Sequence, residues 1–122
     1  MSKERRAAWF GIVSAILVLF GIAYVIFGLK MLPVPRPVLL DWESALYGAI
    51  MMGWGVTLAL VGRIAFRRDD AELKRALLVG LVTWLAVEAG ASAWLGVWFN
   101  VGVDACVLAL FVLPLRKRPN RG

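Results

Sequence analysis

Four long apolar runs follow one another along this sequence, and they constrain the fold more than any other feature. Each run approaches the ~20 residues that an α-helix needs to cross the hydrocarbon core of a bilayer. Backbone amides inside a bilayer must be hydrogen-bonded within their own segment, so each run is expected to be a helix. The sequence therefore predicts an all-α protein, a four-transmembrane-helix bundle with short connecting loops that forms a single integral membrane domain over residues 1–122. The predicted helices span residues 7–29, 44–66, 72–95 and 98–115.

The composition supports this interpretation. The chain is 61% hydrophobic and 18% charged, whereas soluble domains average about 45–50% apolar and about 25% charged residues. The first apolar run follows basic residues, as a secretory signal would, but it exceeds the ~7–15-residue apolar core of a signal and no A-x-A-like cleavage pattern closes it. We therefore expect the first run to be a retained transmembrane helix.

The basic residues predict the orientation. All but Lys30 and Arg36 of the 14 Lys and Arg residues fall on one side of the predicted bundle. The positive-inside rule then places both termini in the cytoplasm, and we expect the membrane to be a bacterial cytoplasmic membrane. This basic collar would attract anionic lipid headgroups, and it lacks the aromatic-interleaved platform of a nucleic-acid-binding surface. The residues on the cytoplasmic side are Lys3, Arg5, Arg6, Arg63, Arg67, Arg68, Lys74, Arg75, Arg116, Lys117, Arg118 and Arg121.

Several kinds of chemistry are excluded by residue type. Cys106 is the only cysteine and the sequence has no histidine, so an intramolecular disulfide, a CxxC redox pair and a His-ligated haem are not available. There is no Ser/His or Cys/His pair, no phosphate-binding loop and no metal-ligand spacing. We therefore expect a non-enzymatic protein without cofactor or metal.

One polar constellation stands out against this apolar background. Glu88 lies in the middle of the third run, and an ionisable group in hydrocarbon is a candidate functional site because burying it is costly. Residues four apart share a helix face, which puts Glu88 with Ser92, and Asn100 with Asp104. A short turn between the third and fourth helices lets these two faces meet. The candidate site for a proton, a cation or another ligand comprises Glu88, Asp104, Tyr24, Tyr47, Ser92, Asn100 and Trp84.

No Lys or Arg shares the predicted depth of this constellation, so we expect at least one carboxyl group to be protonated at neutral pH. The hypothesis is that Glu88 is protonated or shares a proton with Asp104, Tyr24 or Tyr47. Three roles remain open: a hydrogen-bonded structural link across the bundle, a cavity open to the outside that binds a proton or cation, and a surface that docks a larger membrane complex.

Other local patterns give further predictions. Small residues repeat every four positions in the second run, a stripe that permits close helix packing within the bundle or in a homo-oligomer. Its members are Ala45, Ala49, Gly53 and Thr57. Asp41 is predicted to cap the second helix, after an extended proline-rich loop over residues 31–37. Asp69 and Glu72 resemble a capping box for the third helix, and Arg63 is expected to be a snorkelling anchor.

In layout the chain is similar to small multidrug-resistance exporters, fluoride channels and four-helix DoxX-like proteins. The exporters have an essential Glu in their first helix, whereas the first apolar run here contains no acid. Exporters and fluoride channels that form antiparallel dimers have weak charge bias, and the strong bias of this chain argues against such a dimer. These residues assign the chain to no family.

The sequence favours a structural or accessory component of a membrane assembly. The alternative is a proton- or cation-coupled small transporter or channel whose binding site is Glu88 with Asp104. A water-accessible cavity that reaches Glu88 would favour transport, and a packed, sealed site would favour structure.

Overall fold

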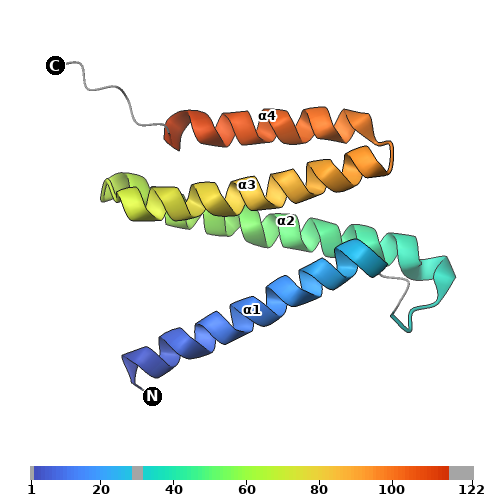
Figure 1. Ribbon diagram of the computed structural model, residues 1–122, viewed down its shortest axis with the longest axis horizontal. Coiled ribbons are helices and arrows are strands. Elements are labelled where there is room, and N and C mark those ends of the chain that lie inside the picture. Colours follow the sequence, from blue (N-terminus) through green and yellow to red (C-terminus); the bar gives the residue numbers. More distant parts are fainter. Residues whose placement is uncertain (1, 29–31, 116–122) are drawn as a thin grey trace. The chain divides into compact units, whose positions relative to one another are not determined.

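The computed structural model describes residues 2–28 and 32–115, and within them the chain forms four α-helices (Figure 1). This confirms the all-α prediction. Some of the basic residues that predict the orientation lie outside the described residues: Lys30 and those from Arg116 onward. The side chains of Lys3 and Arg6 are not described either. In chain order the helices are α1 (Lys3–Phe27), α2 (Arg36–Arg67), α3 (Ala71–Trp94) and α4 (Trp98–Leu115).

Three of these helices, α2, α3 and α4, are long and apolar enough to cross a membrane, which indicates an integral membrane protein. In α1 the described apolar stretch is shorter and covers Val18–Phe27. The 32 residues of α2 correspond to a length of roughly 48 Å at ~1.5 Å per residue. Because a hydrocarbon core is only ~30 Å thick, α2 must tilt or project beyond it.

The chain divides into two compact units, and the boundary lies inside α2, between Ala49 and Ile50. The first unit contains α1 and the start of α2. Its α1 begins after Ser2, whose hydroxyl accepts the Arg5 N–H at 3.3 Å, as an N-cap does. The helix ends at Gly28, which has a φ of 72° and donates its N–H to the carbonyl oxygen of Tyr24 at 2.9 Å.

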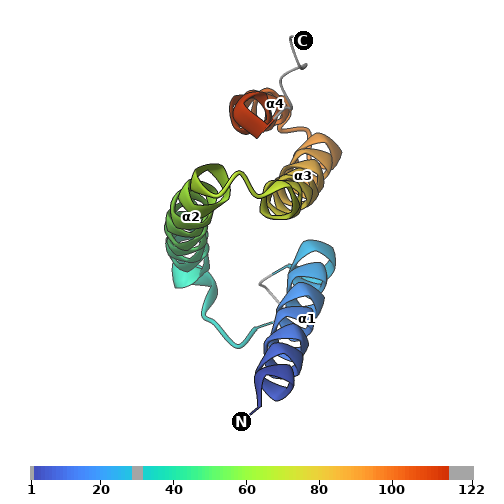
Figure 2. The same ribbon diagram turned by 90° about the vertical axis from the view of Figure 1, so that its left-hand side faces the viewer.

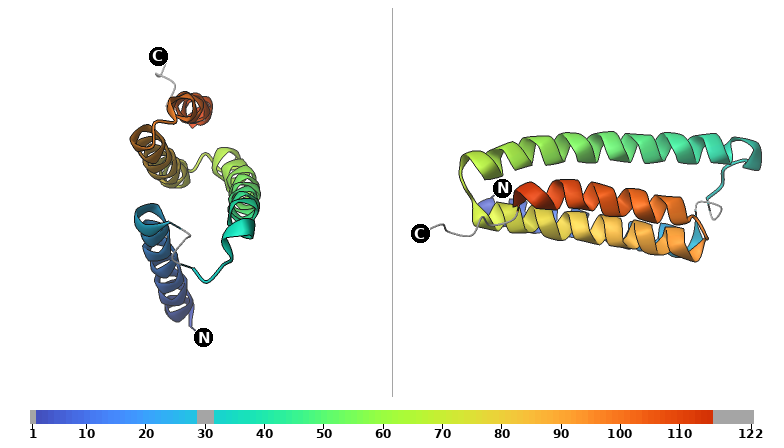
Figure 3. Two further views of the ribbon diagram at one scale, coloured as in Figure 1. Left: turned by 90° about the vertical axis from the view of Figure 1, so that its right-hand side faces the viewer. Right: turned by 90° about the horizontal axis from the view of Figure 1, so that it is seen from above.

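The second unit contains the rest of α2 together with α3 and α4. Helices α3 and α4 run side by side in opposite directions and form a hairpin (Figures 2 and 3). Trp54 of α2 contacts Trp84 of α3 edge to face, with ring centroids 6.5 Å apart. Among residues with described side chains, the buried ones all belong to this unit: Leu58, Ala65, Leu81, Leu85 and Asp104.

Most large apolar side chains of the described residues point outward instead of into this small core. Trp94 is 91% exposed, Phe99 76% and Met52 74%. Soluble monomers rarely expose large contiguous apolar patches, and such surfaces mark contact with a membrane or another protein. The helices therefore have the outward apolar surface of a membrane-embedded protein.

The predicted start of the second helix is wrong by eight residues. Helix α2 begins at Arg36, so Asp41 lies inside the helix and is not its N-cap, and the extended loop ends before Pro37. Proline fits the first turn of a helix because the N–H groups there have no intrahelical partner. The hydroxyl of Ser44 donates to the carbonyl oxygen of Leu40 at 3.0 Å, which shows continuous helical geometry across this stretch.

The predicted capping box of the third helix is displaced by one residue. The N-cap is Asp70, whose carboxylate accepts the Leu73 N–H at 3.0 Å, and Glu72 is one position too early to complete a box. Asp69 instead ends α2 with a left-handed φ of 47°. Asp69 donates its N–H to the carbonyl oxygen of Phe66 at 3.2 Å, and Asp70 donates its N–H to the carbonyl oxygen of Ala65 at 2.9 Å. These two bonds make a Schellman turn.

Candidate functional site

The turn between α3 and α4 sets the register of the candidate site. Gly96 has a φ of 77°, and its N–H bonds the carbonyl of Ala93 at 3.1 Å, while Val97 donates its N–H to the carbonyl of Ser92 at 2.8 Å. These two bonds make a Schellman motif, in which a left-handed residue, usually glycine, stops the helix. Only residues 95–97 separate the helices, so the end of α3 and the start of α4 are held against each other.

Asn100 is the centre of the cluster that this turn creates. Its side-chain Nδ2 lies 2.9 Å from the hydroxyl of Ser92, 3.3 Å from Oδ2 of Asp104 and 3.5 Å from Oε1 of Glu88. An amide NH₂ has two hydrogens, so the three acceptors compete for two bonds, and the bond to Ser92 has the best distance. The amide thereby links α4 to two successive turns of α3.

The cluster lies in the interior of the helix hairpin. Asp104 is only 4% exposed and is the one polar residue that is buried among the described side chains. Glu88, Ser92 and Asn100 are partly buried. A buried polar group without a hydrogen bond is costly, so the amide of Asn100 stabilises Asp104 at this position.

Two carboxyl groups that converge on one amide have limited chemical options. They can share a proton, because a protonated carboxyl gains a donor for its neighbour, or their oxygens can hold a cation. They can also serve only as hydrogen-bond acceptors that fix the helices to each other. Ser92 adds a hydroxyl to the cluster, within hydrogen-bond distance of the same amide as the two carboxyl groups.

The structure brings together four of the seven predicted site residues, namely Glu88, Ser92, Asn100 and Asp104. Trp84 lies one turn before Glu88, and its ring packs against Trp54 of α2. Tyr24 and Tyr47 belong to the first unit, where the ring of Tyr24 lies 6.4 Å from that of Phe20.

The small-residue stripe of α2 is exposed. A methyl group built on Gly53 would meet no atom within 4 Å, and the hydroxyl of Thr57 bonds the carbonyl of Gly53 at 2.8 Å within its own helix. Close packing of another helix on this stripe therefore stays a prediction, because no described helix packs against Gly53. The four members of the stripe, Ala45, Ala49, Gly53 and Thr57, are all solvent-exposed in the structure.

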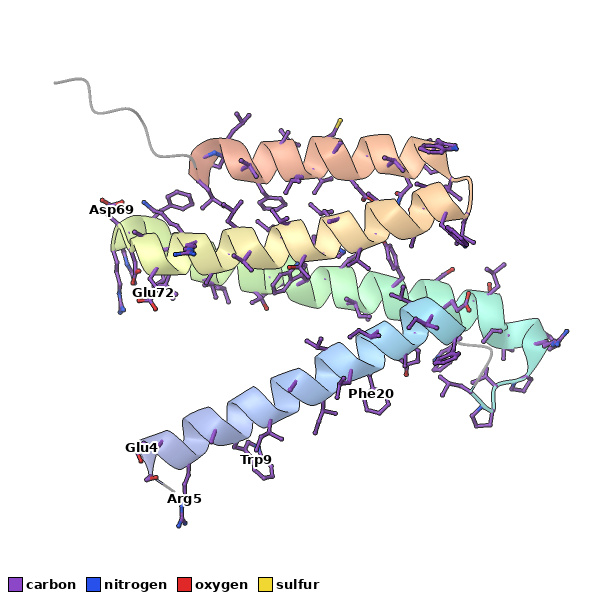
Figure 4. The ribbon with its side chains drawn as sticks, in the orientation of Figure 1. Glu4, Arg5, Trp9, Phe20, Asp69 and Glu72 are labelled. Atoms are coloured by element: carbon purple, nitrogen blue, oxygen red, sulfur yellow. The ribbon has the colours of Figure 1, made fainter. Side chains whose placement is uncertain are left out.

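At the opposite end of α3, the turn after α2 carries charged groups (Figure 4). The ammonium of Lys74 bonds the carboxylate of Asp69 and lies 5.2 Å from the ring centroid of Phe66. The hydrogen bond from Lys74 and then its positive charge hold the pKa of Asp69 below its ordinary value. Asp69 is highly exposed, so this ion pair is a surface pair that solvent screens.

A cavity of about 300 Å³ near this end was not predicted from the sequence. It lies where α2, α3 and α4 approach one another, and Arg63 is among its lining residues. Arg63 was expected to be a simple surface anchor; its side chain is exposed and also borders this cavity. The sequence signal was the small pair Ala59 and Gly62 beside it, which leaves room next to the guanidinium.

Comparison with known proteins adds no relative: no family model, curated protein or solved structure matches the chain.

Proposed function

We propose that this protein is a small polytopic protein of the bacterial cytoplasmic membrane, with four spanning helices and both termini in the cytoplasm. In this proposal it is a non-enzymatic structural or accessory component of a membrane assembly. Three helices of spanning length and the outward apolar side chains support the membrane location. The distribution of Lys and Arg supports the orientation.

The observation that supports the structural role is that the polar groups of the cluster form hydrogen bonds with one another through the side chain of Asn100. Its amide lies within hydrogen-bond distance of Ser92, Asp104 and Glu88, which ties α4 to α3. Interhelical hydrogen bonds in membranes contribute ~0.6 kcal/mol each on average. The cluster then acts as an internal clamp that gives the hairpin one register and leaves the outer helix faces for a partner.

The small-residue stripe supports an assembly role. Gly53 and Ala49 are exposed on α2, and stripes of this kind let helix backbones approach closely in lipid, where packing drives association. The partner is a second copy of this chain or a helix of a larger membrane complex.

Proton- or cation-coupled transport is the second candidate. It rests on the convergence of Glu88 and Asp104 on one amide, because paired acids within a membrane often lie on ion paths. The near-complete burial of Asp104 favours the clamp over a site that water and ions enter freely.

The two candidates are separated by paired measurements on the full chain. We expect affinity purification in mild detergent to recover a stable partner or an oligomer, with recovery unchanged in the isosteric variants Glu88→Gln and Asp104→Asn. Replacing stripe residues, as in Gly53→Leu, should reduce that recovery, whereas Gly90→Leu on α3 is the control. Proton or cation flux into proteoliposomes that disappears in Glu88→Gln would reject the structural proposal in favour of transport.

A further inference from the structure

Two adjoining cavities lie in the second unit, at the end of α3 opposite to the hydrogen-bonded cluster. The first has a volume of about 300 Å³ and is lined mainly by apolar residues of α2, α3 and α4, including Leu81 and Phe111. The second has a volume of about 440 Å³. Both are lined by Pro114 and Leu115 at the end of α4, so the two cavities are neighbours.

Basic side chains line both cavities. Arg63 borders the first, and Lys74 and Arg75 border the second. The charge of Lys74 is balanced by Asp69, to which it is bound. Within the described residues neither Arg63 nor Arg75 forms an ion pair. The carboxylate of Asp69 also lines the second cavity, where Lys74 binds it. Two guanidinium groups without ion pairs among the described residues thus line these two cavities, of which the first is largely apolar.

We propose that these neighbouring cavities together bind one anionic phospholipid, with an acyl chain in the apolar cavity and the phosphate at Arg63 and Arg75. This inference rests on the proposed function, because it needs this end of the helices to lie at the cytoplasmic leaflet. Basic pockets between membrane helices on that side suit anionic headgroups. Arginine suits phosphate especially well, because its planar fork donates two parallel hydrogen bonds to phosphate oxygens.

The chemistry of the cavities favours a lipid over other occupants. Ligand pockets commonly have volumes of about 300–1,000 Å³, and each of these cavities lies in that range. A free phosphate would satisfy the arginines but leave the apolar walls uncovered. The sequence after Leu115 reads RKRPNRG, with four basic residues and Pro119 as its one apolar side chain, so it suits neither the apolar walls nor the basic rim.

The test is native mass spectrometry of the full-length protein, delipidated in detergent and titrated with phosphatidylglycerol or with phosphatidylcholine of the same chains. We expect one phosphatidylglycerol to bind and to resist activation in the gas phase, with weaker binding of the zwitterionic lipid. In the double variant Arg63→Gln, Arg75→Gln, affinity should fall about 30-fold, from ~1 kcal/mol per basic side chain. Arg68→Gln, in the same basic segment but not lining either cavity, should have no effect on this bound lipid.

A second variant tests the cavity instead of the charge. Gly62 lines the first cavity, and a methyl group built on it meets no atom within 4 Å, so Gly62→Leu should fill the space while α2 stays intact. We expect this variant to lose the retained lipid. Gly55→Leu is the matched control, because Gly55 has equally open surroundings in the same helix but does not line the cavity.

The outcomes separate this inference from the membrane proposal. Equal binding of the two lipids, or no effect of Gly62→Leu, overturns the lipid site alone. Glycerol phosphate without acyl chains that binds as tightly as phosphatidylglycerol would show an anion site and would also overturn the proposal. Release of the protein from membranes by alkaline carbonate would instead overturn the proposed membrane function, whatever the lipid titrations give.

Discussion

The amide of Asn100 in α4 donates to the hydroxyl of Ser92 in α3 at 2.9 Å, across a link of only three residues. Ser92 is held a second time, because its carbonyl oxygen accepts the N–H of Val97 at 2.8 Å. The backbone turn and the side-chain cluster therefore enforce the same register between the two helices.

Removing the central amide should destabilise the hairpin more than removing one of its acceptors. Ser92→Ala should lower the free energy of unfolding by ~0.6 kcal/mol, the average value of an interhelical hydrogen bond. Asn100→Leu should cost about 1–3 kcal/mol, because it also leaves the buried Asp104 without this donor. Unfolding by sodium dodecyl sulfate in mixed micelles measures both; equal losses would mean that the amide does not organise the cluster.

The protonation hypothesis predicts a vibrational signature. If Glu88 is protonated or shares a proton with Asp104, infrared spectra at neutral pH should contain the carbonyl stretch of a protonated carboxylic acid. That band should shift or vanish in Glu88→Gln, and Glu72→Gln in the exposed turn provides the control. A spectrum with bands of ionised carboxylates alone would reject the protonation hypothesis, and the hydrogen-bond distances of the cluster would still stand.

Glycine is required at the tip of the hairpin for conformational reasons. Gly96 has a φ of 77°, where a side chain costs roughly 1–2 kcal/mol, so Gly96→Ala should lower stability by about that amount. Gly90→Ala in α3 is the comparison, since a methyl group there meets nothing within 4 Å and alanine has the higher helix propensity. Detergent unfolding curves should move in opposite directions for the two variants.

The ion pair at the α2–α3 turn predicts a pH dependence of defined sign. Lys74 lowers the pKa of Asp69 from its ordinary value of 3.8. The stabilisation from the pair is therefore complete above that value and is lost as the pH falls through the lower pKa of the folded state. We expect Lys74→Gln to return the pKa of Asp69 toward its ordinary value, as measured by nuclear magnetic resonance titration of the carboxyl carbon. Arg68→Gln, which removes a nearby charge without a bond to Asp69, should leave most of the shift in place.

Much of the candidate site could be predicted from spacing alone. Residues four apart share a helix face, which placed Glu88 with Ser92 and Asn100 with Asp104, and the short link between the helices brought the two faces together. The central role of Asn100 could not be predicted, because it depends on the register that the Gly96 turn imposes. Trp84 was grouped with the cluster by the same spacing rule, but its ring extends to Trp54 on another helix.

The errors at the two helix starts have separate local causes. The prolines of residues 31–37 were interpreted as an extended loop, although Pro37 lies in the first turn of α2, a place that proline fits, and so α2 was predicted to start too late. At α3 the sequence offers both Asp69 and Asp70 as caps, and only the left-handed backbone of Asp69 decides between them. The cavity beside Arg63 is formed by three helices together, so the small pair Ala59 and Gly62 could indicate it only once the packing of those helices was known.

The boundary between the two compact units falls within α2, a single unbroken helix. The chain is regular helix at this boundary, so it can change direction there only if the helix bends. Hydroxyl groups that bond the carbonyl four residues earlier commonly bend helices, and Thr57 makes such a bond to Gly53 just past the boundary. Replacing Thr57 by valine would remove this bond, and with it a cause of bending in α2, while every contact within the α3–α4 hairpin stays the same.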